Sequence, residues 1–234
     1  IAAIRAWFEE TGSLPCNIRL VLEGEEEIGS PNLERFMDSH PECFEADVMV
    51  LTDCENPSTE VPGLTVSLRG LMELELRCEA LEADVHSGLW GNMVPDVTMV
   101  LFKLIARLVD EDGRMQIGRV DVPEEWSKAA WDVPLDAGVI RKGGHITEGI
   151  QPLPDRGRPP AEWLWRQPAV TVVSTTMPTF DQKKNALRRH ASAILSIRIA
   201  PGQTADEMRA LLEGQLLENV PGGVHVTLGE SLAS

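Results

Sequence analysis

The chain has 234 residues, of which 43% are hydrophobic and 25% are charged, and its formal net charge is -16. This length fits one large or two small globular domains with a sizeable core. The strong negative charge argues against a nucleic-acid partner, and no apolar run approaches the roughly 20 residues of a membrane span.

The four cysteines lack the paired spacing of a zinc knuckle. They are Cys16, Cys43, Cys54 and Cys78. We therefore expect reduced thiols and a cytoplasmic protein. Cys54 follows Asp53 and could be a soft metal ligand, but a small residue that closes a strand is the better interpretation.

The first predicted element is an amphipathic helix that carries Ile4, Trp7 and Phe8 and ends near Gly12. Apolar residues then dominate positions 17–22, which predicts a short buried strand.

A second helix is expected next, with Ser30 as its N-cap, Pro31 at its first position and His40 near its end. Residues 46–52 read as another buried strand. A strand, helix, strand unit of this length normally leaves its two strands parallel, so their carboxyl ends open on the same edge of the sheet.

Acidic residues follow both predicted strands. Glu25, Glu26 and Glu27 lie on the turn after the first strand, and Asp53 ends the second. Carboxylates gathered at one edge need a compensating cation, donors or water, and oxygen ligands suit a divalent metal. The alternative is that these acids complement the dipole of the following helix and face water.

Three segments in this order resemble landmarks of the M20 family of metallopeptidases. They are residues 23–30 (EGEEEIGS), Asp53, and residues 85–91 (VHSGLWG). The resemblance is nearest to the carnosinase-like dipeptidase branch and related deacylases.

The resemblance implies roles for four residues. Glu26 would be the general base, and Glu27 and Asp53 would each bind one of two divalent ions, which would be zinc, manganese or cobalt. His86 would sit in the lid domain and reach into a partner subunit's site to stabilise the oxyanion. Taken alone, His86 would be an ordinary turn histidine.

Other parts of the family pattern are missing from the sequence. The family also uses an upstream His-x-Asp motif, a bridging Asp and a late His, and none of the five histidines stands in such a place. We therefore expect an interior portion of a longer enzyme, which binds metal weakly and hydrolyses little by itself.

The second part of the chain predicts a split βαβ plan. Strands are expected at 64–79, 169–173, 191–199 and 224–228, with helices at 95–109 and 204–217. Such a chain forms a four-stranded antiparallel sheet with helices on one face, similar to the family's lid and dimerisation domain.

The predicted fold class is therefore α/β. Residues 1–61 would form part of a parallel α/β metallopeptidase catalytic domain, and residues 62–234 a ferredoxin-like α+β lid. An insert at about 111–167 interrupts the lid and should carry its own short helices or pack on the lid. Four tryptophans lie in it, and we expect ordinary packing for Trp126, Trp131, Trp163 and Trp165.

Two further residues are candidates for substrate binding. Arg198 lies in a segment that is similar to the family segment whose arginine grips the substrate's carboxylate; the alternative is an arginine paired with a surface acid. Asn185 is the second candidate. The chain departs from the family pattern at residues 185–188, which lack a proline, at residues 174–184, which replace a glycine-rich loop, and at Asn92, where glycine is usual.

Two classes of function are compatible with these features. The first is a metal-dependent hydrolase that cleaves an amide bond of dipeptides or N-acyl amino acids. The second is a non-catalytic module that holds two subunits together. In either case we expect a homodimer formed through the lid, and for the 234 residues alone little turnover.

Overall fold

The computed structural model describes residues 1–51, 53, 60 and 62–233, and the chain divides into two units, Ile1–Glu55 and Asn56–Ser234. We describe each unit by itself. The structure does not describe residue 61, where the first domain is predicted to end, so this boundary stays a prediction.

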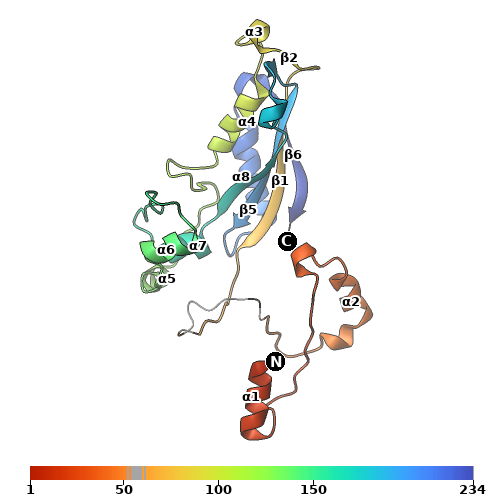
Figure 1. The fold of residues 1–234 in the computed structure, drawn as a ribbon, viewed down its shortest axis with the longest axis vertical. Helices are drawn as coiled ribbons and strands as arrows, with labels where there is room; N and C mark the ends of the chain where they lie inside the picture. Colours follow the sequence, from red (N-terminus) through yellow and green to blue (C-terminus); the bar gives the residue numbers. More distant parts are fainter. Residues whose placement is uncertain (52, 54–59, 61, 234) are drawn as a thin grey trace. The chain divides into compact units, whose positions relative to one another are not determined.

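Short helices make up the regular structure of the first unit (Figure 1). The helix predicted at the start is confirmed as α1, Ala2–Thr11, and Gly12 ends it with a φ of 73°. The second predicted helix is confirmed as α2, Leu33–Ser39. It begins later than predicted, because Ser30 has a φ of 50° and is not the N-cap. The described residues of this unit also form two 3₁₀ turns, η1 (Glu26–Ile28) and η2 (Pro41–Cys43).

The two strands predicted in this unit are not formed: the described residues 17–22 and 46–51 contain no strand. Their apolar side chains are largely exposed, with Leu22 at 78% and Val48 at 75%. A strand of a parallel sheet is stable only when neighbouring strands pair with it and helices cover both faces. The described part of residues 1–55 supplies neither, so the predicted pairing is wrong for this structure.

The lid contains the four-stranded antiparallel sheet that the sequence predicts. Its order is β3 (Ala169–Thr175), β5 (His190–Ile199), β1 (Gly70–Glu79) and β6 (His225–Ala233). The first strand begins at Gly70 and not at residue 64. Helices α4 (Val97–Ala106) and α8 (Ala205–Leu217) pack on one face, as the split βαβ plan requires (Figure 1).

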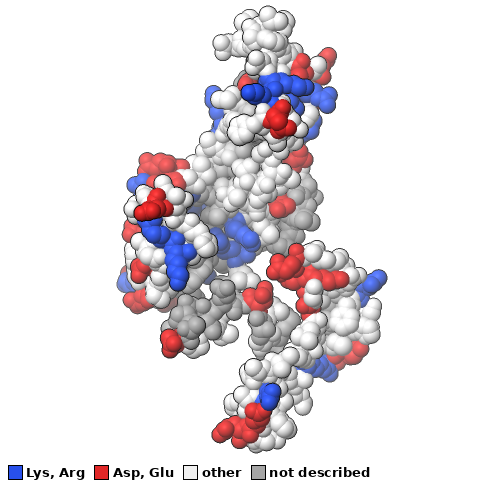
Figure 2. Space-filling view, viewed as in Figure 1, with Lys and Arg blue, Asp and Glu red and all other residues white. Residues whose placement is uncertain are grey.

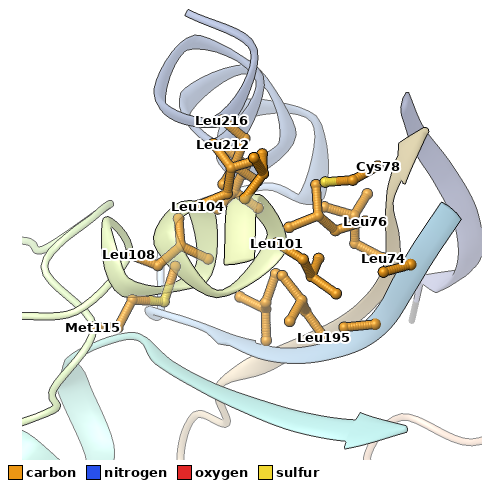
Figure 3. Packing of buried hydrophobic residues seen from close by; sticks show 14 of the residues in the cluster. Leu74, Leu76, Cys78, Leu101, Leu104, Leu108, Met115, Leu195, Leu212 and Leu216 are labelled. Atoms are coloured by element: carbon orange, nitrogen blue, oxygen red, sulfur yellow. The ribbon is translucent and has the colours of Figure 1, made fainter. Parts of the chain in front are cut away.

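The core lies between this sheet and the two helices (Figure 3). Alternate residues of β1 point into it, so Leu74 and Leu76 are fully buried. They face apolar residues of α4, including Leu101 and Leu104. Burying one leucine side chain contributes about 1.5–3 kcal/mol, which makes this layer the main source of stability in the lid.

Both lid helices begin at side-chain caps. The carboxylate of Asp96 accepts hydrogen bonds from the amides of Thr98 and Met99 at the start of α4. Thr204 and Glu207 form a reciprocal capping box at the start of α8. These caps fix where each helix starts above the sheet.

The insert carries three short helices, as predicted: α5 (Glu124–Ala130), α6 (Ala137–Gly143) and α7 (Pro160–Arg166). Gln167 anchors it, because this 1% exposed side chain exchanges hydrogen bonds with the backbone of Val120 in both directions.

Of the four tryptophans in the insert, Trp163 packs as predicted. Its indole N–H donates to the carbonyl of Asp155 at 2.7 Å, and the guanidinium of Arg114 lies 4.5 Å from the ring centre. The other three remain about half exposed: Trp126, Trp131 and Trp165. The helices formed by the described residues are all too short or too polar to cross a membrane.

Candidate functional site

The acidic turn is built around η1. Glu26 and Glu27 are adjacent in this single turn, both are exposed, and Gly29 closes it with a φ of 84°. Adjacent residues on such a turn can direct their side chains differently, so the two carboxylates can have different roles.

The neighbouring Glu25 has a structural role that the sequence reasoning missed. Its carboxylate accepts from the side-chain amide of Asn32 at 2.9 and 3.0 Å, and from the backbone amide of Asn32 at 3.3 Å. These bonds tie the acidic turn to the start of α2. An asparagine just after a proline at a helix start is the one signal that could have indicated this contact.

Asp53 is exposed, and the structure does not gather it with the other acids. Within the described part of the chain, no group of three or more His, Cys, Asp or Glu side chains could hold a metal ion. The carboxylates were expected to meet because two parallel strands would end at the same edge of a sheet, and these strands are not formed. Cys54, the other candidate ligand, lies outside the described residues.

His86 lies in the lid, in a small second sheet. There β2 (Val85–His86) pairs antiparallel with β4 (Ala186–Leu187), which brings His86 opposite Ala186. The carbonyl of Asn185 accepts from the amide of Ser87 at 3.0 Å. The structure therefore brings the backbones at two predicted site residues, His86 and Asn185, side by side.

Backbone geometry shapes the turn after His86. Helix α3, Ser87–Trp90, ends at Gly91, where a Cβ would lie 2.6 Å from the carbonyl oxygen of Ser87. Asn92 follows with a φ of 64°, a left-handed conformation that asparagine tolerates better than most residues. This explains how asparagine stands where the family pattern has glycine.

The segment between β3 and β4 is held at both ends. Thr176 exchanges hydrogen bonds with the backbone of Ser192, and Asn185 is bound to Ser87. At its tip the 3₁₀ turn η3, Phe180–Gln182, presents Phe180 with 97% exposure. These hydrogen bonds thus fix both ends of the loop that replaces the family's glycine-rich segment.

Arg198 is exposed on the face of the sheet opposite the helices, in the central strand β5. Among the described residues it has no ion-pair partner, so the alternative of a surface salt bridge is not seen. Arg69 is close to it: burial lowers the pKa of the Arg69 guanidinium, and the positive charge of Arg198 lowers it further.

Comparison with known proteins agrees with this architecture. The family model of the M20 peptidase dimerisation domain matches residues 66–224. The chain belongs to the M20 family. The family resemblance and the predicted α/β fold class with its lid are confirmed, whereas the parallel strands expected in the first unit are not formed.

Several curated dipeptidases are similar to the chain. It is 33% identical over 219 residues to the cysteinylglycine-S-conjugate dipeptidase of Corynebacterium striatum, covering 93% of this chain and 47% of that protein. It is 30% identical over 215 residues to the Cys-Gly metallodipeptidase of Saccharomyces cerevisiae, covering 88% and 44%. The chain thus spans about half the length of the curated relatives it matches.

Solved structures of related architecture share the fold. The crystal structure of human carnosine dipeptidase 1 superposes with a TM-score of 0.66 at 20% identity, covering 99% of this chain and 50% of that one. An M20 metallo-carboxypeptidase of Sulfolobus solfataricus gives a TM-score of 0.63 at 22% identity, covering 88% and 55%. At such identities the likeness concerns the fold alone.

Proposed function

We propose that the chain is part of a metal-dependent hydrolase that cleaves the amide bond of dipeptides or N-acyl amino acids. The observation that carries the proposal is the β2–β4 pairing, which sets the backbone of His86 beside that of Asn185 at the exposed end of an M20 lid. The similarity to two dipeptidases supports the same class of substrate.

The complete enzyme would use two divalent ions, which we propose to be zinc, manganese or cobalt. Glu27 and Asp53 have the hard oxygen donors that such ions accept, and each would bind one ion. When bound, the ions would acidify a water and polarise the scissile carbonyl. The described residues do not assemble three donors, so we expect the 234 residues alone to bind metal weakly and to turn over little substrate.

In this proposal Glu26 is the general base. Its exposed carboxylate accepts a proton from the attacking water and passes it to the leaving amine. Glu26 is next to Glu27 on η1. The general base would therefore lie beside the metal ligand Glu27, while only Glu27 of the two would bind the metal.

His86 would come from the lid of a second copy and donate a hydrogen bond to the oxygen that becomes negative during attack. Donors that are already placed where charge develops supply much of the rate of acyl transfer. The homodimer would form through the lid, in keeping with the dimerisation domain that the family match describes.

Arg198 would orient the substrate by its carboxylate, and Asn185 would be a second substrate-binding residue. A guanidinium group matches a carboxylate in shape and charge. Lysine and arginine side chains also gather at the end of the lid that carries β2 and α3, in an otherwise acidic chain (Figure 2). Such local positive charge attracts anionic ligands.

The second candidate is a non-catalytic dimerisation module, favoured by the lack of a metal-binding group among the described residues. For both candidates we propose a cytoplasmic location. The described cysteines support it, because Cys16, Cys43 and Cys78 are free thiols.

Dipeptide hydrolysis by the whole natural enzyme that contains this chain, loaded with manganese or zinc, tests the proposal. Glu26→Gln should lower kcat by a factor of about 10² to 10⁴, because it removes the general base. Glu34→Gln, an exposed acid on α2, is the matched control and should retain activity.

Three outcomes separate the candidates. Unchanged activity of Glu26→Gln would exclude the assigned base. A whole enzyme without dipeptidase or deacylase activity would favour the dimerisation module. Robust cleavage by the 234 residues alone would show that the chain is not catalytically incomplete.

A further inference from the structure

The imidazole ring of His86 is held by a bond from its own turn. The backbone amide of Gly88 donates to Nδ1 of His86, with 3.1 Å between the two nitrogens. A backbone N–H can only donate, so Nδ1 must be the accepting, unprotonated nitrogen. A neutral imidazole with a bare Nδ1 carries its proton on Nε2.

The residue at position 88 must be small for this contact to exist. A Cβ at Gly88 would lie 2.9 Å from Cε1 and 3.2 Å from Nδ1 of His86. The first distance is closer than real Cβ contacts, so the ring would have to move. The φ of Gly88 lies outside the left-handed region, so the backbone alone would accept alanine.

The backbone around this contact is fixed at several points. His86 pairs with Ala186, the amide of Ser87 donates to Asn185, and the amide of Gly91 donates to Ser87 at 2.8 Å. The ring therefore takes its direction from a turn that is bonded on both sides. His86 itself is exposed, which leaves Nε2 accessible to a ligand.

We infer that Gly88 is a positioning residue, whose amide fixes the ring and the tautomer of His86 so that the Nε2–H group is the donor offered to the substrate. The inference rests on the proposed function for the identity of the acceptor, the developing oxyanion. The tautomer and the ring position are properties of this chain alone.

The inference explains why the motif reads His-Ser-Gly here. An oxyanion needs an N–H donor, and a histidine with its proton on the wrong nitrogen would present a lone pair. A fixed tautomer removes that unproductive state. A fixed ring also avoids misplacement, which can cost about 10²-fold in rate per ångström.

Nitrogen NMR of the labelled 234-residue chain tests the tautomer directly. At about pH 8, where an ordinary histidine is neutral, the His86 Nδ1 resonance should be of the unprotonated type and Nε2 of the protonated type. His86→Gln removes these signals and so assigns them among the five histidines. A proton on Nδ1, or an average of both tautomers, would overturn the inference.

Gly88→Ala tests the positioning role. It should move the His86 nitrogen resonances toward an averaged tautomer, and in the whole metal-loaded enzyme it should lower kcat about 10- to 100-fold with little change in KM. Gly214→Ala is the matched control, since a Cβ there meets nothing within 4 Å, and it should change neither readout.

The two proposals fail in different ways. If Gly88→Ala leaves both the resonances and kcat unchanged, Gly88 does not position the ring. If the whole enzyme hydrolyses no dipeptide or acylated amino acid, the proposed function fails, while the NMR result still decides the tautomer.

Discussion

The two units of the chain differ sharply in how they use apolar residues. In the lid, Leu74, Leu101 and Leu195 are fully buried between the sheet and its two helices. Among the described residues of the first unit none is buried, and Leu22 and Val48 are mostly exposed. Both regions contain apolar runs of strand type, yet only the lid turns them into a sheet.

The difference shows what each kind of sheet needs. The lid's antiparallel strands find all their partners within residues 70–233, and one helical layer covers them. Within the runs at 17–22 and 46–51, residues 20–22 and 48–51 are consecutively apolar, which suits a parallel strand enclosed by neighbours and helices. Without those partners the same hydrophobicity contributes nothing to stability.

The largest expected effect concerns the core of the lid. Leu74→Ala should destabilise it by about 3 to 5 kcal/mol, because it leaves a cavity between β1 and α4. Urea unfolding followed by circular dichroism measures this loss.

The matched substitution lies in the first unit. Leu22→Ala should change stability by less than about 0.5 kcal/mol, as surface substitutions usually do. A comparable loss of stability in Leu22→Ala and Leu74→Ala would contradict the contrast between the two units.

A smaller effect is expected where a polar side chain anchors the insert. Gln167→Ala removes two hydrogen bonds to Val120 and leaves the half-buried backbone N–H and C=O of Val120 without these partners, at a cost of about 1–3 kcal/mol. The same unfolding assay measures it. Gln215→Ala removes one bond, to the carbonyl of Arg107, and should cost less. Equal losses would show that Gln167 is not an anchor.

The smallest effect is a pH dependence of the insert. Burial raises the pKa of Asp110, but hydrogen bonds from Arg119 and from the amides of Arg114 and Asp112 outweigh it and lower the pKa overall. Because the folded pKa lies below the unfolded value of about 3.9, the stabilisation is present above that pH and is lost as the pH falls through the folded pKa.

Unfolding midpoints measured between about pH 5 and pH 3 test this dependence. The wild type should lose more stability over this range than Asp110→Asn, whose side chain does not titrate. Parallel curves for the two proteins would exclude a contribution from Asp110.

Much of the lid could be predicted from the sequence, because the periodicity of apolar residues and the capping residues of helices are local signals. The alternation through Leu74 and Leu76 indicates a strand with one buried face, and Thr204 with Glu207 marks a helix start. The predicted start of this strand at residue 64 is too early, because the alternation continues upstream of Gly70, where no partner strand pairs.

The candidate site was less predictable, since it depends on contacts between distant segments. The sequence singled out His86 and Asn185 separately, by resemblance, and only the β2–β4 pairing joins them. The amide of Gly88 on the His86 ring could not be read from residue types, because any residue but proline has such an amide. The roles of Glu26, Glu27, Asp53 and Arg198 remain proposals.

Cys78 illustrates what deep burial means for reactivity. Its side chain is fully enclosed in the lid core, and burial raises the pKa of its thiol to about 11. The thiolate is the form that reacts with alkylating reagents. The folded protein therefore lowers the reactivity of Cys78 in two ways: the reagent cannot reach the sulfur, and the thiol stays protonated. An alkylating reagent added to the native chain would modify the exposed Cys16 first. The slower rate at which Cys78 is modified would report how often the lid core opens.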